Sequence, residues 1–182
     1  MLPAPNATAQ VLAVLTLRGS SMNRLIRPAA FALMLMPAMG SAQDFDAGLV
    51  AYQAGDYTTA LREWTPLAEQ GDASAQDMLG LMYQIGEGVA QDYAVAMKWY
   101  RLAAEQGNAD AQYGVGWMYD FGEGVPQDFV TAHMWFNISA ANSWPDAAVL
   151  RDKVAAKLMP ADISEAQRRA KVCMASNYQD CD

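Results

Sequence analysis

The chain has 182 residues and a formal net charge of −8 at neutral pH, and 53% of its residues are apolar. This length and apolar content allow one domain, or one compact array of repeats, around a substantial core. The acidic excess disfavours nucleic acid and anionic lipid as partners, because both would be repelled, whereas a basic protein partner is permitted. Solubility of a repeat array is the simpler explanation for the charge.

The N-terminal part of the chain is typical of a secretory signal peptide. Arg24 and Arg27 precede an apolar run at residues 29–36, and small side chains precede a predicted cleavage site after Ala42. The apolar run is shorter than the roughly 20 residues that a membrane span needs. We therefore expect a bacterial protein that is periplasmic or secreted. A buried N-terminal helix is the alternative interpretation.

Removal of this leader, residues 1–42, would strengthen the acidic character of the chain. We expect translation to start at Met22, because a complete signal follows it and residues 1–21 are not needed for one. After cleavage, nine basic and twenty acidic residues would remain, a net charge of −11. Fifteen of these acidic residues and only three basic ones lie in residues 43–146.

One sequence pattern occurs twice in the middle of the chain. Residues 75–110 and 111–146 align without a gap, with fifteen identities in thirty-six positions. A period of this length is typical of stacked helical hairpins, in which each unit needs a neighbour to cover its apolar face. Apolar residues recur three to five apart, as a core-facing helix requires.

Gly80 and Gly116 occupy the same position inside the first predicted helix of each repeat. Glycine destabilises a helix interior by about 1 kcal/mol relative to alanine, so its recurrence indicates a packing role. We expect two helices to approach closely there, with an aromatic side chain in the space.

Each repeat also contains the segment Gly-Glu-Gly-Val, at residues 86–89 and 122–125. A glycine-rich turn before a helix can bind phosphate, but such a loop follows a strand and contains little negative charge. Here a helix is predicted before each segment, and a glutamate lies in its centre. We therefore predict the corner of a hairpin, with Gly86 and Gly122 in the left-handed conformation that ends a helix.

The repeat pattern extends in both directions. Residues 43–74 match it partly, as a divergent N-terminal repeat. Residues 147–182 match it weakly, because polar residues take several apolar positions, as in a terminal capping unit. Pro160 separates the last two amphipathic segments. We expect an all-α fold of about four antiparallel hairpins, with the first and fourth as caps.

Both cysteines, Cys173 and Cys181, lie in the last ten residues. An even count after a secretory leader predicts a disulfide bond. In one continuous helix their Cα atoms would be roughly 12 Å apart, too far for a bridge, so the chain must turn between them. A metal site is disfavoured, because the one histidine, His133, is far away in sequence.

The repeated motif, A-x-x-x-x-G-x-M-Y-x-x-G-x-G-V-x-x-D-x-x-x-A-x-x-W-Y/F-x-x-x-A, resembles the Sel1-like repeat, a relative of the tetratricopeptide repeat. Its first copy runs from Ala75 through Asp92 and Trp99, and the resemblance is specific over residues 75–141. It implies a right-handed α-solenoid that acts as an adaptor for other proteins, in bacteria often in the periplasm or outside the cell. It implies no catalytic residue and no cofactor.

The sequence contains no serine-hydrolase elbow, zinc-peptidase helix or P-loop motif. His133 stands where the preceding repeat has Met97, so we interpret it as a packed helix residue. We therefore expect a binding protein and not an enzyme. The alternative is an envelope hydrolase that acts on peptidoglycan or a β-lactam, since some cysteine-rich members of this family have been linked to penicillin binding. Their cysteine pair within each repeat is missing here.

The candidate binding residues are positions that differ between the two repeats. Three positions in each repeat follow i, i+4, i+7 spacing and so form one stripe on the predicted first helix. They are Asp77, Leu81 and Gln84 in the first repeat, and Tyr113, Trp117 and Asp120 in the second. Helical repeats usually present this helix on their concave side, and aromatic residues dominate interface energetics. We expect a protein or peptide to bind there; the alternative is that Leu81 and Trp117 are ordinary core residues.

Overall fold

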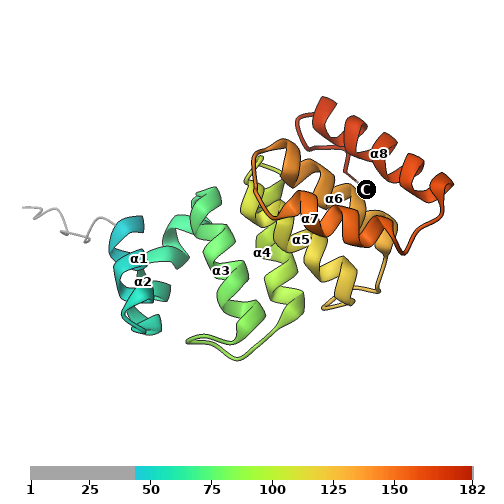
Figure 1. Cartoon of the computed structure of the whole chain (residues 1–182). Coiled ribbons are helices and arrows are strands. Elements are labelled where there is room, and N and C mark those ends of the chain that lie inside the picture. Colours follow the sequence, from blue (N-terminus) through green and yellow to red (C-terminus); the bar gives the residue numbers. More distant parts are fainter. Residues whose placement is uncertain (1–43, 182) are drawn as a thin grey trace, which may run out of the picture. The chain divides into compact units, whose positions relative to one another are not determined.

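The structure is a computed structural model that describes residues 44–181. The predicted leader, its cleavage site and the proposed start at Met22 lie outside the described residues. Within residues 44–181 the chain forms eight α-helices and no strand (Figure 1). The helices are α1 (Phe45–Gln53), α2 (Tyr57–Glu69), α3 (Ala73–Ile85), α4 (Tyr93–Ala104), α5 (Ala109–Phe121), α6 (Phe129–Ala141), α7 (Ala147–Ala155) and α8 (Pro160–Ala175).

Successive helices pair into hairpins. The α1 helix packs on α2, α3 on α4 and α5 on α6, while α2 packs on α3 and α4 on α5 to join neighbouring hairpins. Figure 1 shows these helices following one another in chain order. This arrangement confirms the expected all-α solenoid. The α3–α4 and α5–α6 hairpins begin at Ala73 and Ala109, two residues before the repeat boundaries predicted from the sequence.

The close approach predicted at the helix glycines is present in both repeats. A Cβ atom at Gly80 would lie 2.6 Å from Cδ1 of Tyr100, and one at Gly116 would lie 2.8 Å from Cδ1 of Phe136. Both rings are buried. Each aromatic side chain of a second helix therefore fills the space that the missing side chain leaves on the first helix.

The first hairpin uses the same contact with a shorter corner. Gly48 packs directly against the buried ring of Trp64, the counterpart of Tyr100. The indole Nε1 of Trp64 donates to the carbonyl oxygen of Phe45 at 3.1 Å. Residues 54–56 join α1 to α2, whereas residues 86–92 join α3 to α4. This shorter connection explains why residues 43–74 match the repeat only in part.

The Gly-Glu-Gly-Val segments are corners, as predicted, and they also join hairpins. The first glycine of each segment ends its helix in the left-handed region, with φ values of 79° and 71°. The second glycine touches the preceding hairpin: a Cβ atom at Gly88 would lie 2.6 Å from Cβ of Tyr57, and one at Gly124 would lie 2.7 Å from the carbonyl oxygen of Tyr93. A larger residue at either position would separate the two hairpins.

Buried glutamines connect the hairpins from within. Nε2 of Gln76 donates to the last turn of α2 at 3.0 Å, and Nε2 of Gln112 donates to the last turn of α4 at 3.1 Å. Their Oε1 atoms accept from residues in the connections after α4 and α6: Gln76 from Nε2 of Gln106 at 2.7 Å, and Gln112 from Nδ2 of Asn142 at 2.8 Å. Each buried amide is therefore paired on both sides, which offsets the cost of burying it.

Many acidic side chains have a structural role at helix starts. The N-cap side chain accepts a backbone N–H in each helix from α1 to α6, and this residue is Asp in all of them except α5, where it is Asn108. Such caps stabilise a helix by about 1 kcal/mol each. Part of the acidic excess is therefore explained by capping.

The last two helices depart from the regular hairpin. Both α7 and α8 pack against α6 and scarcely contact each other. On α8, the guanidinium of Arg169 donates to the Thr131 hydroxyl of α6 at 3.1 Å. The α6 helix is consequently covered on two sides, and its residues Trp135, Phe136 and Ile138 are fully buried.

A disulfide bond closes the C-terminal tail. Cys173 and Cys181 are bonded with their Cα atoms 4.5 Å apart, as predicted. The chain turns between them at Tyr178, whose φ is 64°. The Tyr178 ring packs against Gly107, and its hydroxyl accepts from Nδ2 of Asn142 at 2.9 Å. The tail is thereby attached to the connections after α4 and α6.

We expect Gly116→Ala to destabilise the protein by about 1–3 kcal/mol, although alanine favours a helix by about 1 kcal/mol. The added methyl group must displace the buried Phe136 ring. Urea denaturation measures the change. Phe136→Leu makes room for this methyl group. The double variant should therefore lose less stability than the sum of the losses in the two single variants. Strict additivity would contradict the proposed contact.

Candidate functional site

A groove of about 640 Å³ lies between α3 and α5, the first helices of the two repeats. Five of the six predicted binding residues line it: Asp77, Leu81 and Gln84 from α3, and Tyr113 and Trp117 from α5. The two helices contact each other directly, so the two predicted stripes face one hollow. The volume is in the range of pockets that bind small ligands or peptide side chains.

The sixth predicted residue, Asp120, lies outside this groove. Its carboxylate accepts from Nζ of Lys157 at 2.7 Å, and the residue is buried. Lys157 follows α7, in the irregular C-terminal part that the repeat pattern does not describe. Asp120, one of the six predicted binding residues, therefore does not line the groove.

The floor of the groove is the ring of Tyr100, which lies between two glycines. Gly80 of α3 meets one side, and a Cβ atom at Gly114 of α5 would lie 2.9 Å from Cζ of the ring. The Tyr100 hydroxyl donates to Oε1 of Gln84 at 2.8 Å, and Nε2 of Gln84 donates to Oε2 of Glu123 at 3.2 Å. Burial raises the pKa of Tyr100, so the hydroxyl remains a donor at neutral pH.

One side of the groove is an aromatic wall, defined here as Tyr113, Trp117 and Trp144. Ring centroids are 5.8 Å apart for Tyr113 and Trp144, 6.3 Å for Tyr113 and Trp117, and 4.4 Å for the stacked pair Trp117 and Phe121. Phe121 is 53% exposed. The indole Nε1 of Trp144 is buried and has no hydrogen-bond partner among the described residues. Phe121 stacks on Trp117 but lies outside the groove lining. Trp144 was not predicted from the sequence, because it lies in the connection between α6 and α7, outside the repeated stripe.

Two carboxylates of the groove stand near each other without a cation. Asp77 on α3 and Asp110 on α5 both line the groove, and neither forms an ion pair with a basic residue within residues 44–181. Burial, followed by the charge of Asp110, raises the pKa of Asp77 to about 7. Burial also raises the pKa of Asp110. The groove therefore holds carboxylates in a setting that disfavours their charge.

Other chemistry is not evident in the described part of the chain. His133 is buried in α6, as interpreted from the sequence, and burial lowers its pKa. No group of three or more His, Cys, Asp or Glu within residues 44–181 is arranged to hold a metal ion. None of the helices of this region is long and apolar enough to cross a membrane.

The burial of the Asp77 carboxylate predicts that the stability of the protein depends on pH. Because folding raises its pKa from 3.8 to about 7, the native state binds the proton more tightly. The contribution of this proton to the free energy of unfolding is fully present below pH 4 and is lost as the pH rises through 7. We expect Asp77→Asn to stabilise the protein at pH 8 by roughly 1–2 kcal/mol, and to have little effect at pH 4.

Urea denaturation at both pH values tests this expectation. The control is Glu69→Gln, which removes an exposed carboxylate of α2. Equal effects of Asp77→Asn at the two pH values would contradict it.

Comparisons with known proteins agree with the repeat pattern. A family model described as Sel1 repeat matches residues 73–108 and 109–143. The chain is similar to the crystal structure of a Sel1 repeat protein from Oxalobacter formigenes, with a TM-score of 0.54 and 34% sequence identity. The match covers 60% of this chain and 85% of the Oxalobacter chain. No curated protein matches.

A second solved structure is that of a protective antigen present in uropathogenic Escherichia coli strains, which displays an SLR fold. The identity is 26% and the TM-score 0.69, over 73% of this chain and 30% of that chain. The present chain therefore spans less than a third of that antigen.

The matched segments contain the α3–α4 and α5–α6 hairpins, with the glycine–aromatic contacts and corners described above. Sel1 repeats form a scaffold fold, and the proteins that contain them generally bind other proteins. The family match, the identity over most of the Oxalobacter protein and the hairpin structure together show that this chain belongs to the Sel1 repeat family.

Proposed function

We propose that this protein is a periplasmic or secreted adaptor that binds a segment of another protein, or a peptide, in the groove between α3 and α5. The main supporting observation is the groove itself, which has a volume of about 640 Å³ and an aromatic wall. Half-buried aromatic side chains supply much of the binding energy in protein interfaces. A scaffold in envelope signalling or regulation is the role that we propose for it.

The exposure of the groove residues favours binding over ordinary packing. Met82 and Met118, which each follow a groove residue on the same helices, are fully buried. Leu81 and Trp117 are only partly buried and line the hollow instead. An ordinary core residue would be covered like the methionines, so the remaining apolar surface of Leu81 and Trp117 is available to a ligand.

An envelope location has two supports. The Cys173–Cys181 disulfide fits an oxidising compartment, because cytosolic thiols are normally kept reduced. The predicted leader would direct the chain there.

Blocking the groove should abolish capture of a partner. Leu81→Trp places a larger side chain in the hollow, whereas Leu102→Trp makes the same change at an exposed position of α4 outside it. We expect proteins captured from an envelope extract by the unaltered protein and by Leu102→Trp to be missing with Leu81→Trp. The Tyr113→Ala/Trp117→Ala variant should also lose them, and undiminished capture by both groove variants would argue against the groove.

A second candidate, an envelope hydrolase of peptidoglycan, is favoured by one observation. Asp77 and Asp110 are neighbouring carboxylates in a groove, and glycoside hydrolases use such a pair with one raised pKa. Burial raises the pKa of both groups, and no Lys or Arg lines the groove to hold either carboxylate in the ionised form that a base or nucleophile requires. We therefore favour the adaptor.

Purified protein is expected to show no turnover of muropeptides or of a β-lactam above the uncatalysed rate. The groove lining contains no Ser, Cys, Lys or His that would act as a nucleophile or base. Product analysis by mass spectrometry measures this. Peptidoglycan cleavage that disappears with Asp77→Asn would establish the hydrolase instead.

A further inference from the structure

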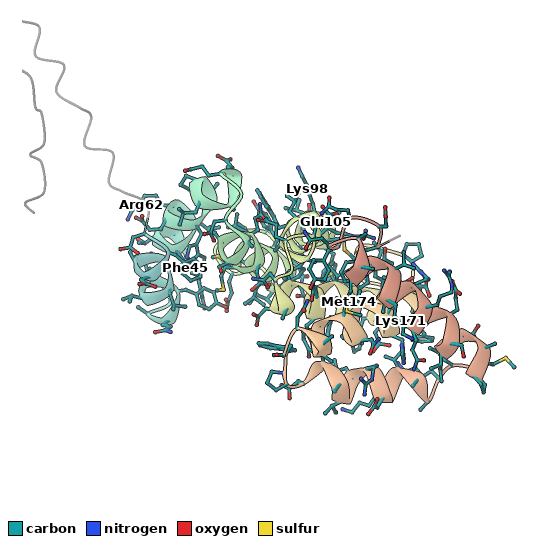
Figure 2. All side chains as sticks on the ribbon, turned by 90° about the horizontal axis from the view of Figure 1, so that it is seen from above. Phe45, Arg62, Lys98, Glu105, Lys171 and Met174 are labelled. Carbon is teal, nitrogen blue, oxygen red and sulfur yellow. A yellow bond between two sulfur atoms is a disulfide. The ribbon has the colours of Figure 1, made fainter. Side chains whose placement is uncertain are left out.

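The groove has a single sign of charge. Asp77, Asp110 and Glu123 line it, and no Lys or Arg does. The basic residues labelled in Figure 2 belong to α2, α4 and α8 and are exposed; they are Arg62, Lys98 and Lys171. Low-dielectric walls of one charge sign concentrate the field inside a groove and attract the opposite charge.

Asp77 has no structural role that explains its position. The caps of the two helices that form the groove are Asp72 and Asn108, whose side chains accept backbone N–H groups of Ala75 and Ala111. Asp77 lies beyond the cap of α3, and no hydrogen bond or ion pair involves its carboxylate among residues 44–181. A carboxylate beside another carboxylate, and partly buried, destabilises the folded protein unless a partner compensates for it.

A cation would compensate for both carboxylates at once. An ammonium or guanidinium group between Asp77 and Asp110 forms charge-assisted hydrogen bonds with each. The aromatic wall supplies an adjacent surface for apolar groups and for cation–π contacts, with Tyr113 and Trp117 on α5.

We propose that the occupant of the groove is a peptide segment of a partner protein in which a Lys or Arg side chain stands next to an aliphatic or aromatic residue. The charged group binds between Asp77 and Asp110, and the apolar neighbour packs on the aromatic wall. This inference rests on the proposed function and specifies the chemistry of the partner. The acidic surplus of residues 43–146, fifteen acidic residues against three basic ones, attracts such a segment from a distance.

The experiment selects ligands from a library of random nonapeptides displayed on phage, with the purified protein as target. Three targets are compared: the unaltered protein, Asp77→Asn/Asp110→Asn, and Glu69→Gln/Asp180→Asn. The last variant removes two exposed carboxylates outside the groove, so it changes the formal net charge by the same amount. The best selected peptide is then synthesised, and its affinity for each target is measured by fluorescence anisotropy.

The expected result is enrichment of Lys or Arg beside an apolar residue, with binding about tenfold weaker to Asp77→Asn/Asp110→Asn and within about twofold for the control. Selection of groove-binding peptides without basic residues, or equal affinity for both double variants, would overturn the inference while leaving the adaptor function intact. Failure to select any peptide whose binding is lost with Leu81→Trp would overturn both.

Discussion

The ring of Tyr100 lies between Gly80 of α3 and Gly114 of α5, and this contact determines the geometry of the described array. A Cβ atom at either glycine would come within 3 Å of the ring, so a side chain there would push the hairpins apart. The contact therefore sets the spacing of three helices from two repeats. The same buried ring forms the floor of the groove, and its hydroxyl donates a hydrogen bond to Gln84.

Duplication and divergence contribute differently to this protein. The residues that the two repeats share make the frame: the helix glycines, the corner segments and the buried glutamines recur at the same interval and make the same contacts. Residues that differ between the repeats give the groove its aromatic side. Gly114 stands where the first repeat has Met78, and Tyr113 and Trp117 stand where it has Asp77 and Leu81. At these positions the α3 side of the groove is therefore acidic and aliphatic, whereas the α5 side is aromatic.

Two kinds of carboxylate explain part of the acidic composition. Those at helix starts accept backbone N–H groups and stabilise the fold. Asp77 does the opposite: burial and a neighbouring Asp110 raise its pKa to about 7. A residue that lowers stability and faces a hollow is a reasonable marker of a binding site. Net charge alone does not distinguish the two kinds.

Local sequence determined the helices, their pairing and the conformation of the corners, because apolar periodicity, N-caps and left-handed glycines act within a few residues of each other. The repeat also predicted five groove residues, since equivalent positions on successive hairpins face the same side. Only the tertiary structure decided that Asp120 pairs with Lys157, that Asp110 and Trp144 join the groove, and that α7 and α8 both pack on α6. These contacts involve either the C-terminal segment, where the repeat pattern is lost, or side chains from different hairpins. They therefore depend on how distant parts of the chain pack together, which a local sequence pattern does not predict.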